Sequence, residues 1–390
     1  MQGPAAASLR FLSEPGREPS GRLRRVKNLT TPAKKDRTTV IRGSGMYVPP
    51  QVYTNEMMGR IMDTTDEWIV PRTGIRERRF VEPGIGSAEL GTKAAEAALA
   101  DAGLAASDID LIIFATMTPD HYFPGNGGLL ARHLGLNKTH ALDIRMQCAG
   151  FLSGLQTADA FIRSGMYDRV LLVGAEVHSG LMPWPESVWD VMLGKTPGPC
   201  DPFWHARATS MRDRAVLFGD GAGAMVLEAN TSGDGRGLLG FAMYTDGNHW
   251  DKLYVPGGGC KSRPFFTPKM FDELGLIPIV EGRHVFRLAT TLMPAAVLDL
   301  LAAHGKALGD LDLLLMHQAN LRINEAAQKA LGLSDDKVFN NIQKYGNTTA
   351  ATLPIVFHEA KLDGRVKAGG LVAFAALGAG LHWGAGLAVA

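Results

Sequence analysis

The sequence predicts an α/β fold made of two similar halves. Residues 109–116 and 169–177 are near-continuous apolar runs, which are typical of strands buried on both faces of a sheet. Helical patterns separate these runs, and a similar order of helix and strand returns after residue 282, without a close sequence repeat. The chain of 390 residues, 46% of them hydrophobic, is long enough to bury a large core.

The first half is expected to begin with a strand near Thr38. A helix start follows at Thr54, and the Ala-rich residues 87–103 predict a helix that packs closely against its neighbours. A loop and a helix occupy residues 118–135. A short strand over residues 140–144 then leads into the helix that we expect to begin at Cys148.

Residues 178–211 interrupt this alternation with three tryptophans and five prolines. We interpret them as an insertion near a pocket, or else as a surface flap packed on its own aromatic side chains. Residues 215–228 are expected to form two strands around glycines. Residues 232–281 are expected to be a Gly/Pro-rich connection.

The second half is predicted from Gly282 onward. The expected elements are a helix over 283–304, a strand over 311–316, a helix over 321–331, a strand near 337–340, a helix from about 349 to 360, and strands over 370–376 and 383–389. We therefore divide the chain into a basic tail (1–37), an N-terminal half (38–235) and a C-terminal half (236–390).

Composition excludes several classes of protein. The net charge of +1 gives no indication of nucleic-acid binding. Three cysteines without CxxC spacing do not indicate a disulfide framework or a zinc site, and they favour a reducing cytoplasm. No apolar run reaches the roughly 20 residues of a membrane span. Residues 1–37 contain nine basic residues and no apolar signal core, so a disordered tail is expected, with a transit peptide as the alternative.

Cys148 is a candidate nucleophile because it lies where a strand becomes a helix. The N–H groups at a helix start favour a thiolate, and the small residues Ala149 and Gly150 leave the backbone open to a ligand. A lone cysteine beside an apolar helix is, however, more often a buried hydrophobic residue. His317 directly follows a buried strand and Asn347 precedes a helix, so the three residues form a possible Cys/His/Asn site.

Several motifs resemble those of the β-ketoacyl-acyl-carrier-protein synthase III family of thiolase-fold condensing enzymes. They are DEWIVPRTGIRERR, the CAGF that begins at Cys148, LFGDGAGAMVLE, EGRHVFRLA, MHQANLRI, YGNTTAATLP and LHWGAG, and the resemblance runs from about Thr38 to Ala390. It implies a five-layered α/β/α/β/α fold of two pseudo-repeated halves, and a homodimer.

The resemblance also implies a mechanism that needs no cofactor or metal. Cys148 attacks an acyl-CoA thioester, and the backbone N–H groups of Cys148 and Ala379 form the oxyanion hole. His317, as a neutral donor, and Asn347 hold the thioester oxygen of the malonyl-acyl-carrier protein during decarboxylation. Two departures from the family pattern are Ala379, where glycine is usual and a positive φ would strain alanine, and His382, which we expect to pack in the core.

The resemblance assigns further residues to the substrates. Trp68 and Arg212 would flank the adenine of CoA, with Arg72 and Thr73 nearby and Arg283 beside the pantetheine tunnel. Phe123 would reach across the dimer into the partner's acyl pocket, where relatives that join two long acyl chains carry a glutamate. A basic patch would dock the acidic carrier protein, although it could be only a solvated face. This patch consists of Arg287, Arg322 and Lys329.

The expected function is decarboxylative condensation of an acyl-CoA primer with malonyl-acyl-carrier protein, which starts fatty-acid or polyketide synthesis. We expect Phe123 and the insertion to set the primer size. An alternative is a specialised ketosynthase or acyltransferase that uses the same site with another acceptor. A non-enzymatic acyl-CoA-binding protein is a third possibility, but the presence of all three polar residues does not favour it.

Overall fold

A computed structural model describes residues 37–390, so the expected tail lies, apart from Arg37, outside the described residues. The first sheet has the strand order β1-β7-β6-β4-β5. β4 is parallel to β5 and β6, and β7 is antiparallel to β6 and β1. The strands are β1 (Thr38–Tyr47), β4 (Leu111–Ala115), β5 (His140–Ile144), β6 (Arg169–Glu176) and β7 (Gly221–Asn230).

The second sheet has the order β12-β11-β13-β14-β8. β11 is parallel to β12 and β13, whereas β14 is antiparallel to β13 and β8. The strands are β8 (Gly237–Thr245), β11 (Leu313–Met316), β12 (Val338–Phe339), β13 (Leu371–Gly378) and β14 (His382–Val389). Each sheet therefore draws its strands from one continuous part of the chain.

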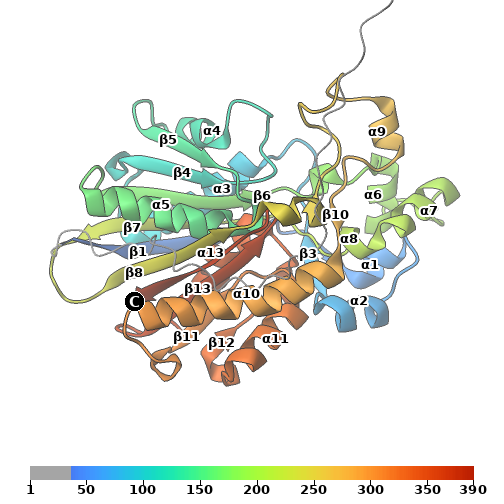
Figure 1. Ribbon diagram of the computed structural model, residues 1–390. Coiled ribbons are helices and arrows are strands. Elements are labelled where there is room, and N and C mark those ends of the chain that lie inside the picture. The colour runs from blue at the N-terminus through green and yellow to red at the C-terminus, as the bar shows by residue number, and fades with distance from the viewer. Residues whose placement is uncertain (1–36) are drawn as a thin grey trace, which may run out of the picture.

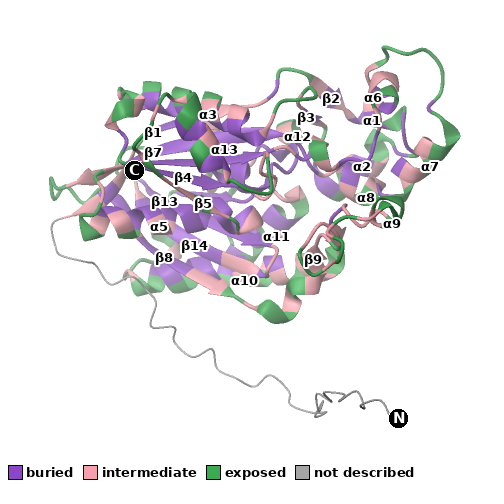
Figure 2. Ribbon diagram, turned by 90° about the horizontal axis from the view of Figure 1, so that it is seen from above, coloured by how far each residue is buried: buried purple, intermediate pink, exposed green. Residues whose placement is uncertain are grey.

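Helices complete five layers, α/β/α/β/α, as Figure 1 shows. Two helices cover the outer face of the first sheet, two lie between the sheets, and two cover the outer face of the second. In that order they are α3 (Ser87–Ala102) and α4 (Asn126–His133), α5 (Gly150–Ser164) and α13 (Thr352–Leu362), and α10 (Gly282–Ala303) and α11 (Leu321–Leu331). Figure 2 shows the buried residues concentrated in the sheets and the inward faces of the helices.

The central layer explains the apolar composition of its two helices. α5 and α13 each face a sheet on both sides, so residues such as Phe151, Leu152 and Leu353 are completely buried in one continuous core. Burying a side chain of this size contributes about 1.5–3 kcal/mol. The shared core fixes the two sheets relative to each other.

Smaller elements form a side region against one end of the sheets. They are β2 (Val52–Thr54), β3 (Glu77–Arg79), β9 (Leu253–Tyr254), β10 (Ile279–Val280), α1 (Asn55–Gly59), α2 (Asp66–Thr73), α6 (Glu186–Leu193), α7 (Pro202–Ser210), α8 (Arg212–Ala215), α9 (Pro268–Asp272) and α12 (Ile342–Tyr345). Thr54 caps α1 as predicted, by accepting a hydrogen bond from the N–H of Met57.

Three expectations about local structure are wrong. Residues 215–228 contain one strand instead of two, because Ala215 ends the helix α8 and the strand β7 begins only at Gly221. The Gly/Pro-rich residues 232–281 contain β8, an edge strand of the second sheet. Cys148 lies in a 3₁₀ turn, Gln147–Ala149, and α5 begins two residues later at Gly150.

The expected insertion at 178–211 folds into two helices, α6 and α7. Trp189 packs against Tyr53, Phe80 and Trp184, with ring centroids 5–6 Å apart. These aromatic residues belong to a separate hydrophobic cluster under α1 and α2. The insertion therefore stabilises the side region through its own aromatic side chains.

α10 is the one described helix that is long and apolar enough to cross a membrane by length and composition alone. In the fold it lies against β8, β13, β14 and α11. Its residues Met293, Val297 and Leu300 are at most 2% exposed. This packing is that of a helix covering a sheet.

The contact between β1 and α3 depends on glycine. A Cβ atom added to Gly45 would lie 2.4 Å from the backbone N of Ala98 and 2.5 Å from the carbonyl oxygen of Ala94. Because both atoms belong to a helix backbone, they cannot move aside as a flexible side chain would. The small residues predicted for α3 thus permit direct backbone packing, as expected.

We predict that Gly45→Ala lowers the free energy of unfolding by about 1–3 kcal/mol or more, through overpacking. Gly128→Ala in α4 is the matched control, because a Cβ atom there meets nothing within 4 Å. In a helix this change should be neutral or stabilising by up to about 1 kcal/mol. Urea unfolding followed by circular dichroism would measure both, and equal stabilities of the two variants would contradict the prediction.

Candidate active site

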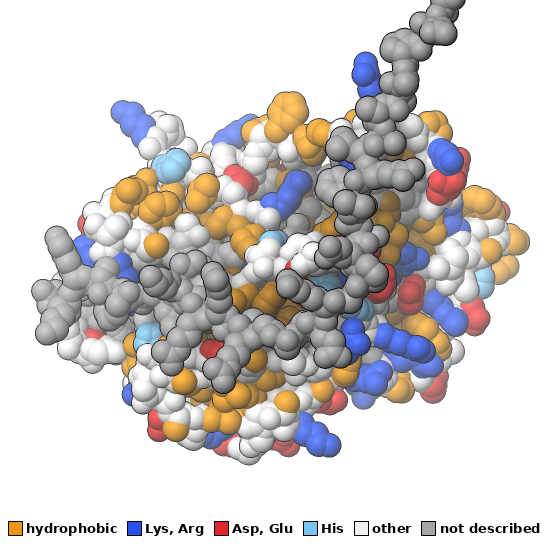
Figure 3. All heavy atoms as spheres, viewed as in Figure 1, with side chains coloured by type: hydrophobic (Ala, Val, Ile, Leu, Met, Phe, Trp, Pro, Cys, Tyr) orange, Lys and Arg blue, Asp and Glu red, His pale blue; other side chains and the backbone are white. Residues whose placement is uncertain are grey.

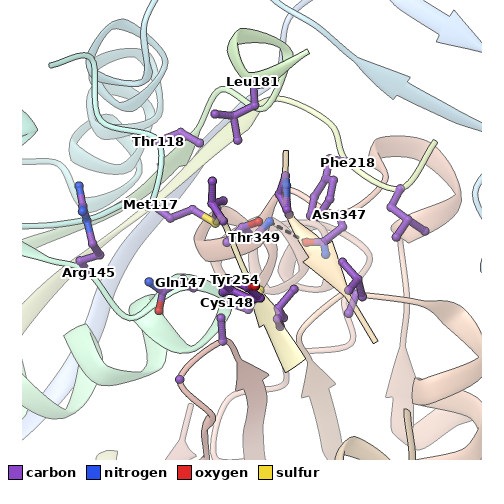
Figure 4. A pocket seen from close by; sticks show the side chains of 18 of the residues that line it. Met117, Thr118, Arg145, Gln147, Cys148, Leu181, Phe218, Tyr254, Asn347 and Thr349 are labelled. Atoms are coloured by element: carbon purple, nitrogen blue, oxygen red, sulfur yellow. Dashed lines mark hydrogen bonds between the residues drawn. The ribbon is translucent and has the colours of Figure 1, made fainter. Parts of the chain in front are cut away.

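Cys148, His317 and Asn347 line a single cavity of about 1010 Å³. Cys148 comes from the turn after β5, His317 follows β11, and Asn347 follows α12. The cavity lies where both sheets present strand ends, so the site takes residues from both halves of the chain. Figure 4 shows Cys148 and Asn347 facing the same space.

The Cys148 thiol is held in a tight turn rather than at the start of a helix. Its side chain is 8% exposed, and the preceding residue, Gln147, has a positive φ of 46°. A non-glycine residue in this region is uncommon and often marks a functional site. The strained turn places the Cys148 sulfur at the cavity. It also keeps the backbone N–H of Cys148 near the end of β13.

The resting thiol is protonated, contrary to the expectation from the helix start. Burial, together with the charge of Glu176, raises the pKa of Cys148 to about 12. A hydrogen bond from the Thr349 side chain and one from the Cys148 backbone act in the opposite direction. The sequence argument failed because desolvation of the sulfur outweighs the N–H groups of the turn.

His317 is neutral in the folded protein. Its side chain is 2% exposed, and burial lowers its pKa to about 3. Nδ1 lies 2.6 Å from the Thr352 hydroxyl, whereas Nε2 is buried and has no hydrogen-bond partner among the described residues. A ring nitrogen without a partner on the cavity wall is available to a ligand.

Asn347 is oriented by its own turn. Its Oδ1 accepts a hydrogen bond from the backbone N–H of Thr349 at 2.8 Å, drawn as a dashed line in Figure 4. The backbone of Asn347 is fixed by its N–H, which donates to the carbonyl oxygen of Leu217. With Oδ1 engaged, the amide nitrogen is the group that Asn347 can offer as a donor to the cavity.

The end of β13 closes the site beside Cys148. A Cβ atom added to Gly378 would lie 3.0 Å from the backbone N of Cys148, so the strand end and the turn are in close contact. Ala379 lines the cavity. In residues 37–390 only Gln147, Leu274 and Thr349 combine a side chain with a positive φ, so Ala379 carries no such strain.

His382 does not pack in the core as expected. It is half-buried and lines the cavity, and its Nδ1 lies 2.8 Å from the Thr245 hydroxyl. The edge of the His382 ring lies against Gly380. A Cβ atom added to Gly380 would be only 2.2 Å from this ring. His382 is the first residue of β14, where the strand borders the cavity, and this position keeps its ring out of the core.

One wall of the cavity was not predicted. It comes from residues 250–286, which the sequence indicated only as a connection and the start of a helix. This wall combines apolar and aromatic side chains with three consecutive glycines, 257–259. Its members include Trp250, Leu253, Tyr254, Val255, Phe266, Leu276, Val280 and Phe286. By contrast, the insertion at 178–211 reaches the cavity through Gly180 and Leu181.

The residues expected to bind adenine lie together on α2 and α8. The guanidinium carbons of Arg212 and Arg72 lie 4.6 and 4.8 Å from the centre of the Trp68 ring. Arg212 also forms an ion pair with Asp63 at 3.3 Å. Because Arg212 already touches the indole, a base can enter between the two only if the guanidinium moves.

Thr73 differs from its expected role. It is 3% exposed, and its hydroxyl donates to the carbonyl oxygen of Ile69 at 2.9 Å and accepts from the N–H of Ile75 at 3.0 Å. Both interactions help to end α2 before Gly74, which has a φ of 79°. Thr73 therefore supports the turn and has no free hydroxyl for CoA.

The expected basic residues are exposed on α10 and α11. Arg283, Arg287, Arg322 and Lys329 make no ion pair with an acid of residues 37–390. Figure 3 shows Lys and Arg side chains gathered over α2 and the N-terminal end of α10. Arg283 itself does not line the cavity, although its neighbour Gly282 does.

Phe123 lies in the loop before α4 and is 80% exposed, the most exposed of the large apolar side chains. Tyr122 beside it is 57% exposed and lines the cavity. β5, at the edge of the first sheet, has no strand on its other side among residues 37–390. Phe123 is therefore an exposed side chain that does not line the cavity of its own chain.

Sequence reasoning missed three buried polar residues behind the nucleophile: Glu176, His178 and Thr349. Glu176 is the last residue of the buried strand β6 and His178 lies two residues beyond it, much as His317 directly follows β11. Polar residues at the end of a buried strand were the signal that could have identified them. No group of three or more His, Cys, Asp or Glu among residues 37–390 is placed to hold a metal ion.

Comparisons with known proteins agree with this arrangement. The family model 3-oxoacyl-[acyl-carrier-protein (ACP)] synthase III matches residues 142–196 and 205–247, and the model of its C-terminal part matches residues 301–389. The beta-ketoacyl-[acyl-carrier-protein] synthase III of Rhizobium rhizogenes is 40% identical over 351 residues, which cover 89% of this chain and 98% of that protein. The enzyme of Caldanaerobacter subterraneus is 39% identical over 343 residues, covering 88% and 95%.

Solved structures give the same result. The 3-oxoacyl-[acyl-carrier-protein] synthase III of Aquifex aeolicus superposes with a TM-score of 0.76 at 37% identity, covering 90% of this chain and 100% of that one. The priming beta-ketosynthase of the R1128 polyketide pathway superposes with a TM-score of 0.75 at 29% identity, covering 91% and 96%. The five-layered thiolase-like fold is confirmed. With relatives at about 40% identity along almost all of its described length, the chain belongs to the beta-ketoacyl-acyl-carrier-protein synthase III family of condensing enzymes.

Proposed function

We propose that this protein condenses an acyl-CoA primer with malonyl-acyl-carrier protein by decarboxylation, through an acyl-Cys148 intermediate. The product is a β-ketoacyl-carrier protein that starts fatty-acid or polyketide synthesis. The observation that carries the proposal is the meeting of a thiol, a neutral imidazole and an oriented amide in one largely apolar cavity. The names of the relatives support the same reaction.

In the first half-reaction the Cys148 thiol loses its proton and its sulfur attacks the thioester carbonyl. The bond to the CoA sulfur breaks, and CoA leaves as a thiolate that takes up a proton. The developing oxyanion would be held by the backbone N–H groups of Cys148 and Ala379. Support comes from the close contact between the end of β13 and the turn that carries Cys148. Since Ala379 has no positive φ, its substitution for glycine leaves the backbone N–H usable.

In the second half-reaction the malonyl group loses carbon dioxide and becomes an enolate. Its oxygen would accept hydrogen bonds from His317 Nε2 and Asn347 Nδ2, and its carbon would attack the acyl-Cys148 carbonyl. The thioester bond to Cys148 then breaks, the β-ketoacyl-carrier protein is released, and the Cys148 thiolate takes up a proton from solvent. This role requires the His317 ring proton on Nε2, so that the Thr352 hydroxyl, which also lies 2.9 Å from the carbonyl oxygen of Thr349, donates to Nδ1 across the 2.6 Å contact. The reaction draws its carbanion from decarboxylation and so requires no cofactor in this scheme.

The substrates would approach from the side of α2 and α10. Trp68, Arg72 and Arg212 offer an aromatic face and two guanidinium groups to the adenine of CoA. Arg287, Arg322 and Lys329, free of ion pairs with described acids, would attract the acidic carrier protein. Arg283, exposed at the start of α10, would contact the pantetheine arm or the CoA phosphates.

We also propose a cytoplasmic homodimer. Three free cysteines suit a reducing compartment. A second copy could cover the exposed Phe123 and the free edge of β5, and Phe123 would then enter the partner's acyl pocket. In that arrangement the size of residue 123 would limit the length of the primer.

A specialised pathway is the second candidate, favoured by one observation. Residues 248–300 lie outside both family matches, yet they supply the wall of aromatic and glycine residues around the cavity. Because this wall lines the cavity, its side chains would influence which primer or acceptor the cavity admits. Mass spectrometry of the products made from a panel of acyl-CoAs, with and without malonyl-carrier protein, distinguishes the candidates.

We predict that Cys148→Ala abolishes both the acyl adduct and the condensation product, because Cys148 is the one of the three cysteines that lines the cavity. Intact-protein mass spectrometry after incubation with acyl-CoA measures the adduct. Cys260→Ser is the matched control, since Cys260 is exposed and does not line the cavity. A full adduct on the Cys148→Ala protein would refute the assignment of the nucleophile.

We predict that His317→Ala and Asn347→Ala still form the acyl-enzyme but slow condensation by about 10²–10³ each, the usual effect of losing one oxyanion donor. Burial holds the pKa of His317 near 3, below its usual 6.5, so the neutral form persists as the pH falls to about 3. The rate of malonyl decarboxylation should therefore show no loss from His317 between pH 8 and pH 5. A rate that follows an ionisation near pH 6.5, absent in His317→Ala, would contradict this.

We predict that Trp68→Ala raises the KM for acyl-CoA by about fivefold, corresponding to roughly 1 kcal/mol of stacking. The KM for the same acyl group on pantetheine, which lacks adenine, should not change. Steady-state kinetics with the two donors makes the comparison. An equal rise for both donors would show that Trp68 acts on the fold of α2 instead.

A further inference from the structure

A second buried histidine lies behind the nucleophile and has no part in the reaction described above. His178 follows β6, is 0% exposed and does not line the cavity. Its ring stacks on Phe218, with centroids 4.4 Å apart and planes at 23°. Because Phe218 is part of the cavity wall, it separates His178 from the substrate.

His178 is connected to the site through Thr349. His178 Nε2 lies 2.7 Å from the Thr349 hydroxyl, which is itself completely buried. The Thr349 side chain also lies close enough to the Cys148 sulfur to lower the pKa of the thiol, and the turns 147–149 and 349–351 pack together. Figure 4 shows Thr349 on the cavity wall between the Asn347 side chain and the interior of the fold.

The backbone of Thr349 is strained in a way that serves this contact. Its φ is 47°, a region that β-branched residues very rarely adopt. Such strain persists where the surroundings hold it, and it clusters at functional sites. Here the Thr349 N–H is held by Asn347 Oδ1 and its hydroxyl by His178, so the residue is fixed from both sides.

The direction of the hydrogen bonds follows from the other nitrogen of the ring. His178 Nδ1 is buried and has no partner among the described residues. A buried N–H without an acceptor is rarer than a buried acceptor without a donor, so the proton belongs on Nε2. His178 then donates to the Thr349 oxygen, and the single hydroxyl proton of Thr349 remains to be donated to sulfur.

We propose that His178 is a positioning residue that, through Thr349, directs a hydroxyl proton at the Cys148 sulfur and so stabilises the thiolate. This inference rests on the proposed role of Cys148 as the nucleophile. A neutral histidine suffices, which agrees with the burial that lowers the pKa of His178 to about 3. When the thiol ionises, its own proton leaves to solvent and the Thr349 proton stays on oxygen.

The other titratable groups around His178 and Thr349 are not members of the chain of contacts that links His178, Thr349 and Cys148. Glu176, at the end of β6, raises the thiol pKa by its charge. Asp220 accepts hydrogen bonds from the backbone N–H groups of His178 and Ser179, so it fixes the turn that carries His178. His317 lies across the cavity and is neutral. None of these groups is altered by the substitutions below.

The test measures the reactivity of Cys148 with iodoacetamide, which follows the thiolate population. Peptide mass spectrometry reports alkylation of Cys148 and of exposed Cys260 in the same sample, so Cys260 corrects for general differences between variants. We expect His178→Leu and Thr349→Val each to slow Cys148 alkylation by about tenfold or more, the effect of losing a hydrogen bond to a charged group. His178→Gln, which keeps an N–H donor, and Thr349→Ser, which keeps the hydroxyl, should stay within about threefold of wild type.

The double variant decides whether His178 acts through Thr349. In the Thr349→Val protein, His178→Leu should cause no further decrease, because the hydroxyl that it orients is gone. An unchanged rate for His178→Leu, or an equal decrease in both backgrounds, would overturn the proposal. Since the assay uses no acyl substrate, absence of condensation activity would refute the proposed function and leave this result standing.

Discussion

The buried carboxylate of Glu176 joins the two halves of the molecule at the active site. It accepts hydrogen bonds from the Thr116 hydroxyl, from the backbone of Met117 and Thr118, and from the N–H of Ala350 in the second half. Satisfying a completely buried carboxylate in this way offsets its large desolvation cost. Because Ala350 lies in the turn after Asn347, this side chain helps to fix the position of that turn relative to Cys148, together with the contacts of Asn347 and Thr349.

The same interaction has an electrostatic consequence. Burial raises the pKa of Glu176 to about 7, and its charge contributes to the high pKa of the thiol. The site therefore combines a structural anion that disfavours the thiolate with backbone and hydroxyl donors that favour it. The carboxylate that holds the two halves together therefore also makes the Cys148 nucleophile less acidic.

The sequence allowed the layers and the three central residues to be predicted, but not the environment of the site. Cys148 and His317 were identified because each follows a strand, and Asn347 because it precedes a helix, and all three line one cavity. β8 was missed because its residues follow a glycine-rich turn and its pairing with β14 is distant in sequence. The thiol pKa and the engaged hydroxyl of Thr73 depend on burial, which local pattern does not reveal. The cavity wall at residues 250–286 was also missed. This segment has little regular structure, so no local pattern indicated that it would cover the cavity.

The protonated resting state of Cys148 has a further consequence for the lifetime of the enzyme. Peroxide and other oxidants react with thiolates, and the resulting sulfenic acid is the first step toward irreversible damage. A sulfur that is 8% exposed and held as the thiol is a poor target for this chemistry. The burial that makes the first chemical step more demanding thus also protects the nucleophile between turnovers, so that slow activation and resistance to oxidative inactivation have a common origin.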